Sequence, residues 1–366
     1  MQLRWVFILC FLFFASTPHA KERNLREHLQ TITPEIEETE EVYWHQVPTW
    51  PRDENRRNPD PKYSANRGGF NLNINALTPW FPEMPTVSAE HLKKGEFKMR
   101  LGINHSSVHQ IHEGNGYALT ADYELVDIYA EMTHQTFERI QLGMILRALH
   151  YSAGRTDPLL NDFHEGLGLK KGVRGDAPIN QYANRFTKDG KTLYDVKNNQ
   201  VGMGDILLIA KFKALDETKN LPTISIVTVL KVPTASDTLG YNSDSWDSIL
   251  GIAMTKQLTQ NLKIHMNTGV TLPGTAKNMP DLSEFYSAMT ALEYFITETF
   301  SIVLQNNFST SPFENYDFRY VNGESWYGSI GLHVRLKNGI QLHFDFTDEF
   351  LNDRDSDFKF GWAWDF

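Results

Sequence analysis

Two histidines near the end of the chain, His333 and His343, are the residues best placed to do chemistry together. Each lies on the polar face of an alternating stretch, and the residues between the two stretches fit a three-residue turn with Gly339 in the left-handed conformation. This turn places His333 opposite His343, with Arg335 and Asp345 nearby. Neighbouring imidazoles can bind a metal ion or change charge at about pH 6.5. The plainer interpretation, which we favour, is an ordinary network of polar side chains, so we predict no metal site and no cofactor.

A second group of candidates lies in the long connection 152–200. Asp162, His164 and Glu165 could bind a cation or act as acid and base, and Phe163 lies among apolar residues spaced three and four apart. That spacing predicts a short amphipathic helix. Adjacent residues of a helix diverge by about 100°, so the three polar groups do not converge by themselves. We expect this helix to cover the mouth of the fold as a lid, with a ligand-binding or gating role as the alternative.

The elements that must position these residues are β-strands with one apolar and one polar face. Phe97, Met99, Leu101 and Ile103 begin the series, and the same period of two recurs to the end of the chain. His265 lies on the polar face of the stretch 262–272 and joins the candidates for a polar interior site. We count about twelve such stretches, which predicts a transmembrane, antiparallel, up-and-down β-barrel with an apolar outer face and a polar lumen.

The connections support this interpretation. Counted from the first strand, the odd-numbered connections are long and the even-numbered ones are short, as expected of a barrel with long outer loops and short periplasmic turns. The phase of the second strand slips at Leu125 and Val126, from which we predict a β-bulge.

The last ten residues form the clearest strand. Large apolar rings alternate with charged or small residues, and the chain ends on the apolar face; the rings are Phe358, Phe360, Trp362, Trp364 and Phe366. This ending resembles the terminal-Phe signal by which bacterial outer-membrane barrels are recognised for assembly. The resemblance implies two partners, the outer-membrane lipid and the barrel-assembly machinery.

Composition excludes several functional classes. The chain has 366 residues, a formal net charge of −10 and a mean hydropathy of −0.41, which suits a barrel because half of each strand is polar. Net acidity opposes a nucleic-acid partner. The single cysteine, Cys10, lies in the first segment, so the remaining chain has neither disulfides nor thiol catalysis.

The chain divides into three parts. Residues 1–20 are predicted to be a secretory signal peptide, with Arg4 before an apolar run and Ala20 at the cleavage point. Residues 21–95 form a Pro-rich irregular segment, which we expect to be a partly disordered periplasmic leader. A plug folded into the lumen is the alternative, because aromatic residues such as Trp80 argue against a wholly solvated tail. Residues 96–366 are the barrel domain.

Three motifs resemble an uncharacterised family of Gram-negative outer-membrane β-barrels, domain of unknown function 3187. They are the loop run 162–169, the run Gly202-Met203-Gly204-Asp205 that opens a strand, and the run Leu230-Lys231-Val232-Pro233-Thr234 that closes the next strand. The chain departs from the family pattern at Ala235, where glycine is usual. The resemblance implies the fold and a Gram-negative outer-membrane location after export through the periplasm. It transfers no catalytic residue.

The function that fits best is a non-enzymatic channel or transporter for a small solute, which includes apolar solutes. One alternative is an outer-membrane hydrolase of lipid or lipopolysaccharide, although no spacing demands a histidine partner for Ser301 or Ser329. The other alternative is a structural or adhesive surface barrel.

Overall fold

The computed structural model describes part of the chain in detail: residues 68–70, 80–154, 156, 158, 180–235, 241, 243–276, 279, 282–337, 339–349 and 358–366. All of these belong to one compact unit, residues 55–366. The predicted signal peptide, most of the Pro-rich leader and the run Asp162-Phe163-His164-Glu165 lie outside the described residues.

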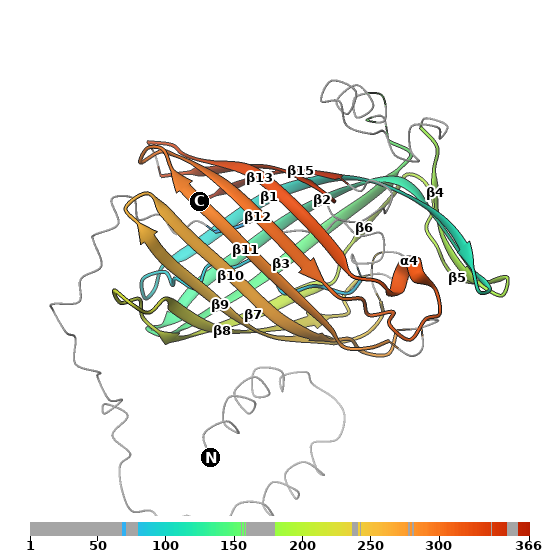
Figure 1. Cartoon of the computed structure of the whole chain (residues 1–366), viewed down its shortest axis with the longest axis horizontal. Helices are drawn as coiled ribbons and strands as arrows, with labels where there is room; N and C mark the ends of the chain where they lie inside the picture. Colours follow the sequence, from blue (N-terminus) through green and yellow to red (C-terminus); the bar gives the residue numbers. More distant parts are fainter. Residues whose placement is uncertain are drawn as a thin grey trace, which may run out of the picture. The chain divides into compact units, whose positions relative to one another are not determined.

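Twelve antiparallel strands form a closed barrel in the described part of the chain, as predicted (Figure 1). Each strand pairs with its neighbour in the chain, and β15 returns to pair with β1. The strands are β1 (Phe97–Gly114), β2 (Tyr117–Phe137), β3 (Ile140–Ser152), β7 (Ile206–Leu215), β8 (Thr223–Val232), β9 (Asp247–Thr259), β10 (Leu262–Leu272), β11 (Phe285–Phe295), β12 (Phe300–Ser309), β13 (Ser325–Arg335), β14 (Gln341–Asp348) and β15 (Phe358–Asp365).

Four short elements are added at the end of the barrel that carries the long connections, which we call the loop end. β4 (Ala183–Lys188) pairs with the first part of β2 and with β5 (Lys191–Asp195). β6 (Gln200–Met203) pairs with the end of β3, and α4 (Arg319–Asn322) lies between β12 and β13. We call the opposite end, where the strands are joined by short connections, the turn end. No helix of the described part is long and apolar enough to cross a bilayer.

The barrel wall has an apolar outer face. Large apolar side chains at alternate positions are exposed on the outside, and the residues between them are buried toward the lumen. On β15, Trp362 and Phe366 are exposed while Lys359 and Asp365 are buried. A belt of this kind suits a lipid environment, because apolar surface is excluded from water and meets hydrocarbon at no cost. Its members include Leu101, Ile128, Leu142, Phe212, Ile226, Leu250, Ile252, Leu304, Ile330, Leu332 and Phe344.

The hairpin of β1 and β2 differs from the predictions in two ways. The register across Leu125 and Val126 is unbroken, so the predicted bulge is wrong. Tyr123 and Leu125 are apolar because, at the loop end, they belong to a buried hydrophobic cluster instead of a polar lumen. The first loop-end connection is short, because the two strands continue to Asn115-Gly116, where both residues have positive φ, 50° and 80°.

The turn between β13 and β14 has the predicted geometry. The Leu336 amide donates a hydrogen bond to the Ile340 carbonyl at 2.8 Å, and Gly339 has a φ of 91°. His333 therefore pairs with His343 across the two strands.

Candidate functional site

Residues 80–96 run through the lumen from the loop end to the turn end, and we call them the luminal segment. At the loop end, Lys231 of β8 donates to the Trp80 carbonyl at 2.7 Å. At the turn end, Gly95 donates a main-chain hydrogen bond to Gln135 of β2 at 2.8 Å, immediately before β1 begins. Phe81 and Ala89 are fully buried. This part of the Pro-rich leader therefore fills space that the wall encloses.

The middle of the luminal segment is held by side chains of the wall. Asn267 accepts from the Val87 amide at 3.1 Å and donates to the Val87 carbonyl at 2.9 Å. Thr255 accepts from the Ala89 amide at 3.1 Å, and Ser225 donates to the Ala89 carbonyl at 2.8 Å. Buried main-chain groups need such partners, and here the polar face of the strands supplies them. The segment is thus bound to the wall without being a strand of it.

Two lysines of the wall also hold the luminal segment near Glu90. Glu90 forms an ion pair with Lys263 of β10 at 3.0 Å. Lys211 of β7 donates to the Ser88 carbonyl at 2.8 Å and to the Glu90 carbonyl at 2.7 Å. Lys211 and Lys263 are both buried, so each ammonium group depends on these acceptors.

The wall also has a recess that fits a side chain of the segment. Gly251 of β9 and Gly269 of β10 lie opposite each other, and the Met84 side chain packs against both. A Cβ atom on Gly269 would lie 3.2 Å from Met84, and one on Gly251 would lie 2.6 Å from its sulfur. The paired glycines therefore leave room that Met84 occupies.

A charged cluster at the loop end joins two of the motifs noted in the sequence. The Lys231 ammonium, 2% exposed, lies 2.5 Å from Asp247 and 3.5 Å from Asp205. Asp205 also accepts from the amides of Thr234 and Ala235, at 3.0 and 3.2 Å. The run 202–205 and the run 230–234 thus meet around one buried lysine that also holds the luminal segment.

The structure brings three of the candidate histidines into one network. Glu293 of β11 lies 3.3 Å from His265 and 3.2 Å from His333, and it accepts a hydrogen bond from Ser301 at 2.6 Å. The rings of His333 and His343 lie 4.5 Å apart, edge to face. All three imidazoles are buried; His265 and His333 share the Glu293 carboxylate, and His343 contacts the network through the His333 ring.

His343 links this network to a second group of charged side chains, and the remaining candidates lie apart from it. His343 continues to Asp365 at 2.9 Å, and Asp365 is held by Arg100 at 2.5 Å. Asp345 forms an ion pair with Lys359 at 2.6 Å, and Arg335 is exposed at the turn end. The Arg100–Asp365 pair thus bridges the barrel closure β1–β15, and the other two pairs join β14 to β15.

The geometry offers little for catalysis or for a metal. Within the described ranges, no group of three or more His, Cys, Asp or Glu side chains could hold a metal ion. Ser301 donates to a carboxylate, whereas a nucleophilic serine would be activated by donating to a histidine.

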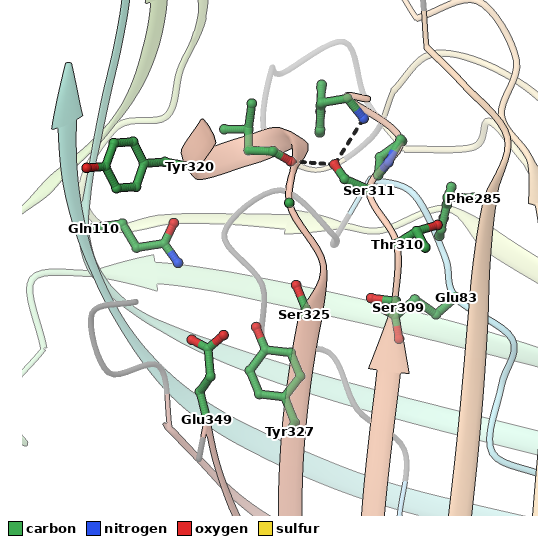
Figure 2. Close-up of a pocket in the computed structure, with 14 residues that line it drawn as sticks. Glu83, Gln110, Phe285, Ser309, Thr310, Ser311, Tyr320, Ser325, Tyr327 and Glu349 are labelled. Carbon is green, nitrogen blue, oxygen red and sulfur yellow. Dashed lines mark hydrogen bonds between the residues drawn. The ribbon is translucent and has the colours of Figure 1, made fainter. Parts of the chain in front are cut away.

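A small pocket at the loop end is lined by hydroxyl groups, two carboxylates and aromatic rings (Figure 2). Glu83 of the luminal segment accepts from Ser309 at 2.9 Å on one side of it, and Glu349 lies on the other side. The pocket shows that polar groups of the segment reach the loop end.

Family membership follows from a comparison of the chain with protein-family models. A family described as a protein of unknown function (DUF3187) matches residues 70–366. The chain belongs to this family. The match includes the whole luminal segment as well as the barrel, so the DUF3187 region covers both parts of the site. None of the curated proteins matches the chain.

Solved structures similar to this DUF3187 protein are barrels of distant sequence. The COG4313 outer membrane channel from Pseudomonas putida F1 is 13% identical, covers 76% of this chain and 98% of its own, and has a TM-score of 0.49. The NanC porin is 8% identical, with 74% and 99% covered and a TM-score of 0.40. The toluene transporter TodX from Pseudomonas putida is 7% identical, with 81% and 98% covered and a TM-score of 0.39.

Proposed function

We propose that this DUF3187 protein is a channel of the Gram-negative outer membrane for a small solute, closed at rest by its own luminal segment. The observation that carries the proposal is the way residues 80–92 are attached. They cross a polar lumen, yet their hydrogen bonds to the wall run through wall side chains. Such a segment can leave while every strand pairing stays intact.

The dimensions of the barrel support a conducting state. Eight-stranded barrels are filled by their own side chains, and barrels of 16 or more strands leave a wide channel. A barrel of twelve strands lies between these sizes, so one extended segment can decide whether the lumen is open. The apolar outer belt supports the membrane location.

Reversing the charge of the luminal segment is expected to open the barrel. Glu90→Lys places a third ammonium group beside Lys263 and Lys211, and two like charges 4 Å apart at an effective dielectric constant of 20 repel by about 4 kcal/mol. We expect frequent single-channel openings in a planar bilayer, and we expect the intact chain to be silent at low voltage.

The matched control is the exchanged pair, Glu90→Lys with Lys263→Glu, which restores one attraction and should restore closure. Glu90→Gln, which removes the charge without repulsion, should give an intermediate open probability. The proposal is contradicted if both variants are shown to be folded and neither Glu90→Lys nor Glu90→Gln passes current.

The last residue is proposed to act in assembly, through the machinery that inserts outer-membrane barrels. The Phe366 amide donates to the Met99 carbonyl at 2.8 Å, and its ring is exposed. Phe366→Ala keeps this main-chain contact and removes the ring. We expect at least a several-fold loss of assembled barrel in cells, measured by heat-modifiable mobility, with unchanged refolding of the purified chain in detergent. An equal loss in both settings means that the ring serves stability instead of recognition.

A further inference from the structure

The loop end of the barrel contains a buried cluster of aromatic side chains. They come from β2, β3, the β4–β5 hairpin and the connections near residues 241 and 316. We call this group the aromatic cluster; its members are Tyr117, Tyr123, Tyr151, Phe186, Tyr194, Tyr241, Phe313, Tyr316 and Phe318.

The luminal segment places its first two side chains in the aromatic cluster. The Trp80 ring lies 4.5 Å from the Tyr194 ring at 88°, and the Phe81 ring lies 5.8 Å from the Phe313 ring at 80°. Both are edge-to-face contacts, the arrangement that aromatic rings prefer. Trp80 is 3% exposed and Phe81 is fully buried. The end of the segment is therefore bound in the way that a small aromatic ligand would be.

Two buried polar atoms at this contact are left without hydrogen-bond partners. They are Nε1 of Trp80 and the hydroxyl of Tyr194, and both side chains are more than nine-tenths buried. Buried polar atoms almost always have partners, so the fit of Trp80 is incomplete. Burial raises the pKa of Tyr194 well above its usual range, so its hydroxyl stays protonated and can donate a hydrogen bond to a bound acceptor.

A second donor contacts the main chain of Trp80. The Lys231 ammonium donates to the Trp80 carbonyl and to the Ser243 hydroxyl, while its charge is balanced by Asp247 and Asp205. When Trp80 leaves, Lys231 loses an oxygen acceptor but keeps its counter-charges. A molecule that replaces Trp80 and Phe81 should therefore be neutral, carry an aromatic ring and present one acceptor oxygen.

We infer that the aromatic cluster is a binding site for a small neutral aromatic molecule with one oxygen, of the phenol type, which takes the place of Trp80 and Phe81. The inference rests on the proposed function and deepens it, because a ligand that occupies the cluster removes the loop-end attachment of the luminal segment. Binding and closure then compete for the same site, and the ligand shifts the population toward the open state.

Competition between the ligand and the two rings of the segment can be tested, because a cluster with a purely structural role would bind no ligand. The probe is radiolabelled phenol, and the measurement is its saturable binding to the folded full-length barrel by equilibrium dialysis in detergent. Trp80→Ala with Phe81→Ala removes the internal competitor, so phenol should bind at least tenfold more tightly than to the unchanged protein. Tyr194→Phe should weaken binding about fivefold. Toluene, which lacks the oxygen, and cyclohexanol, which lacks the aromatic ring, should bind more weakly than phenol.

Release of the segment is measured separately. In a Cys10→Ser background, Ser88→Cys carries the only thiol, in the middle of the luminal segment, and its rate of reaction with a maleimide reports exposure. Phenol should raise this rate at least tenfold, and it should not affect the variant that lacks both rings, which reacts rapidly without phenol.

The outcomes separate the two proposals. Phenol binding that is unchanged or weaker in the Trp80→Ala, Phe81→Ala variant, or that is not saturable in any variant, overturns the binding site, even if Glu90→Lys opens the barrel. Phenol that binds competitively and exposes Cys at position 88 without any current supports the site and contradicts the channel.

Discussion

A chain that begins at Gly95 is expected to conduct ions steadily, whereas the intact protein is expected to conduct none. The truncation removes residues 1–94, which include most of the luminal segment and the buried side chains of Phe70, Phe81, Met84 and Ala89. It leaves every strand from Phe97 onward, together with the main-chain contact of Gly95. Because the wall side chains that held the segment are polar, the emptied lumen fills with water. Conductance of the refolded chain in a planar bilayer measures this effect, which is all-or-none.

Folding must be shown for each sample before the currents are compared. A truncated barrel that keeps its heat-modifiable gel mobility and still passes no current means that the wall side chains fill the lumen by themselves. As a control, Arg335→Ala changes an exposed side chain at the turn end and leaves the luminal segment in place, so this barrel should remain silent.

Loss of the buried lysine at the loop end should destabilise the barrel strongly. In Lys231→Met, the carboxylates of Asp205 and Asp247 stay buried without their counter-ion, and the Trp80 carbonyl loses its donor. Leaving one partner of a buried ion pair unpaired costs about 3–5 kcal/mol. We expect a large fall in the midpoint of unfolding by heat or urea, together with faster reaction of Cys at position 88.

A second substitution separates charge from packing. Adding Asp247→Asn to Lys231→Met removes one of the two buried carboxylates that lack a counter-ion. The double variant should therefore recover a large part of the lost stability. An unfolding midpoint that does not move in Lys231→Met contradicts the role of this cluster, and no recovery in the double variant assigns the loss to packing.

The wall of the barrel could be predicted from the sequence because its signals are local. Alternation decides which face of a strand meets lipid, and one turn decides the register of His333 against His343. The same rule failed at Leu125, where an apolar inner face was interpreted as a change of phase. Alternation shows that a face is apolar, but it does not show whether lipid or a buried cluster covers it.

The luminal segment could not be predicted in the same way. An irregular extended segment has no period, and its contacts come from strands far away in the chain: Asn267 lies 180 residues from Val87, and Ser309 lies 226 residues from Glu83. The only local signal was the presence of aromatic residues among the prolines. The alternation of the strands placed His265 and His333 on the inner face. Their meeting at Glu293 depends on the stagger between strands, which a single sequence does not display.

The closure of the barrel imposes an order of events on its formation. Residues 80–96 precede β1, and the ring of strands is completed when β1 meets β15, the last strand to be made. Trp80 and Phe81 are buried at the loop end, and Met84 lies in its recess in the wall. The segment can therefore enter the lumen most simply before β1 and β15 pair. The strands would then assemble around the luminal segment, which precedes them in the chain. The rate at which β1 pairs with β15 would depend on residues 80–96, which belong to no strand.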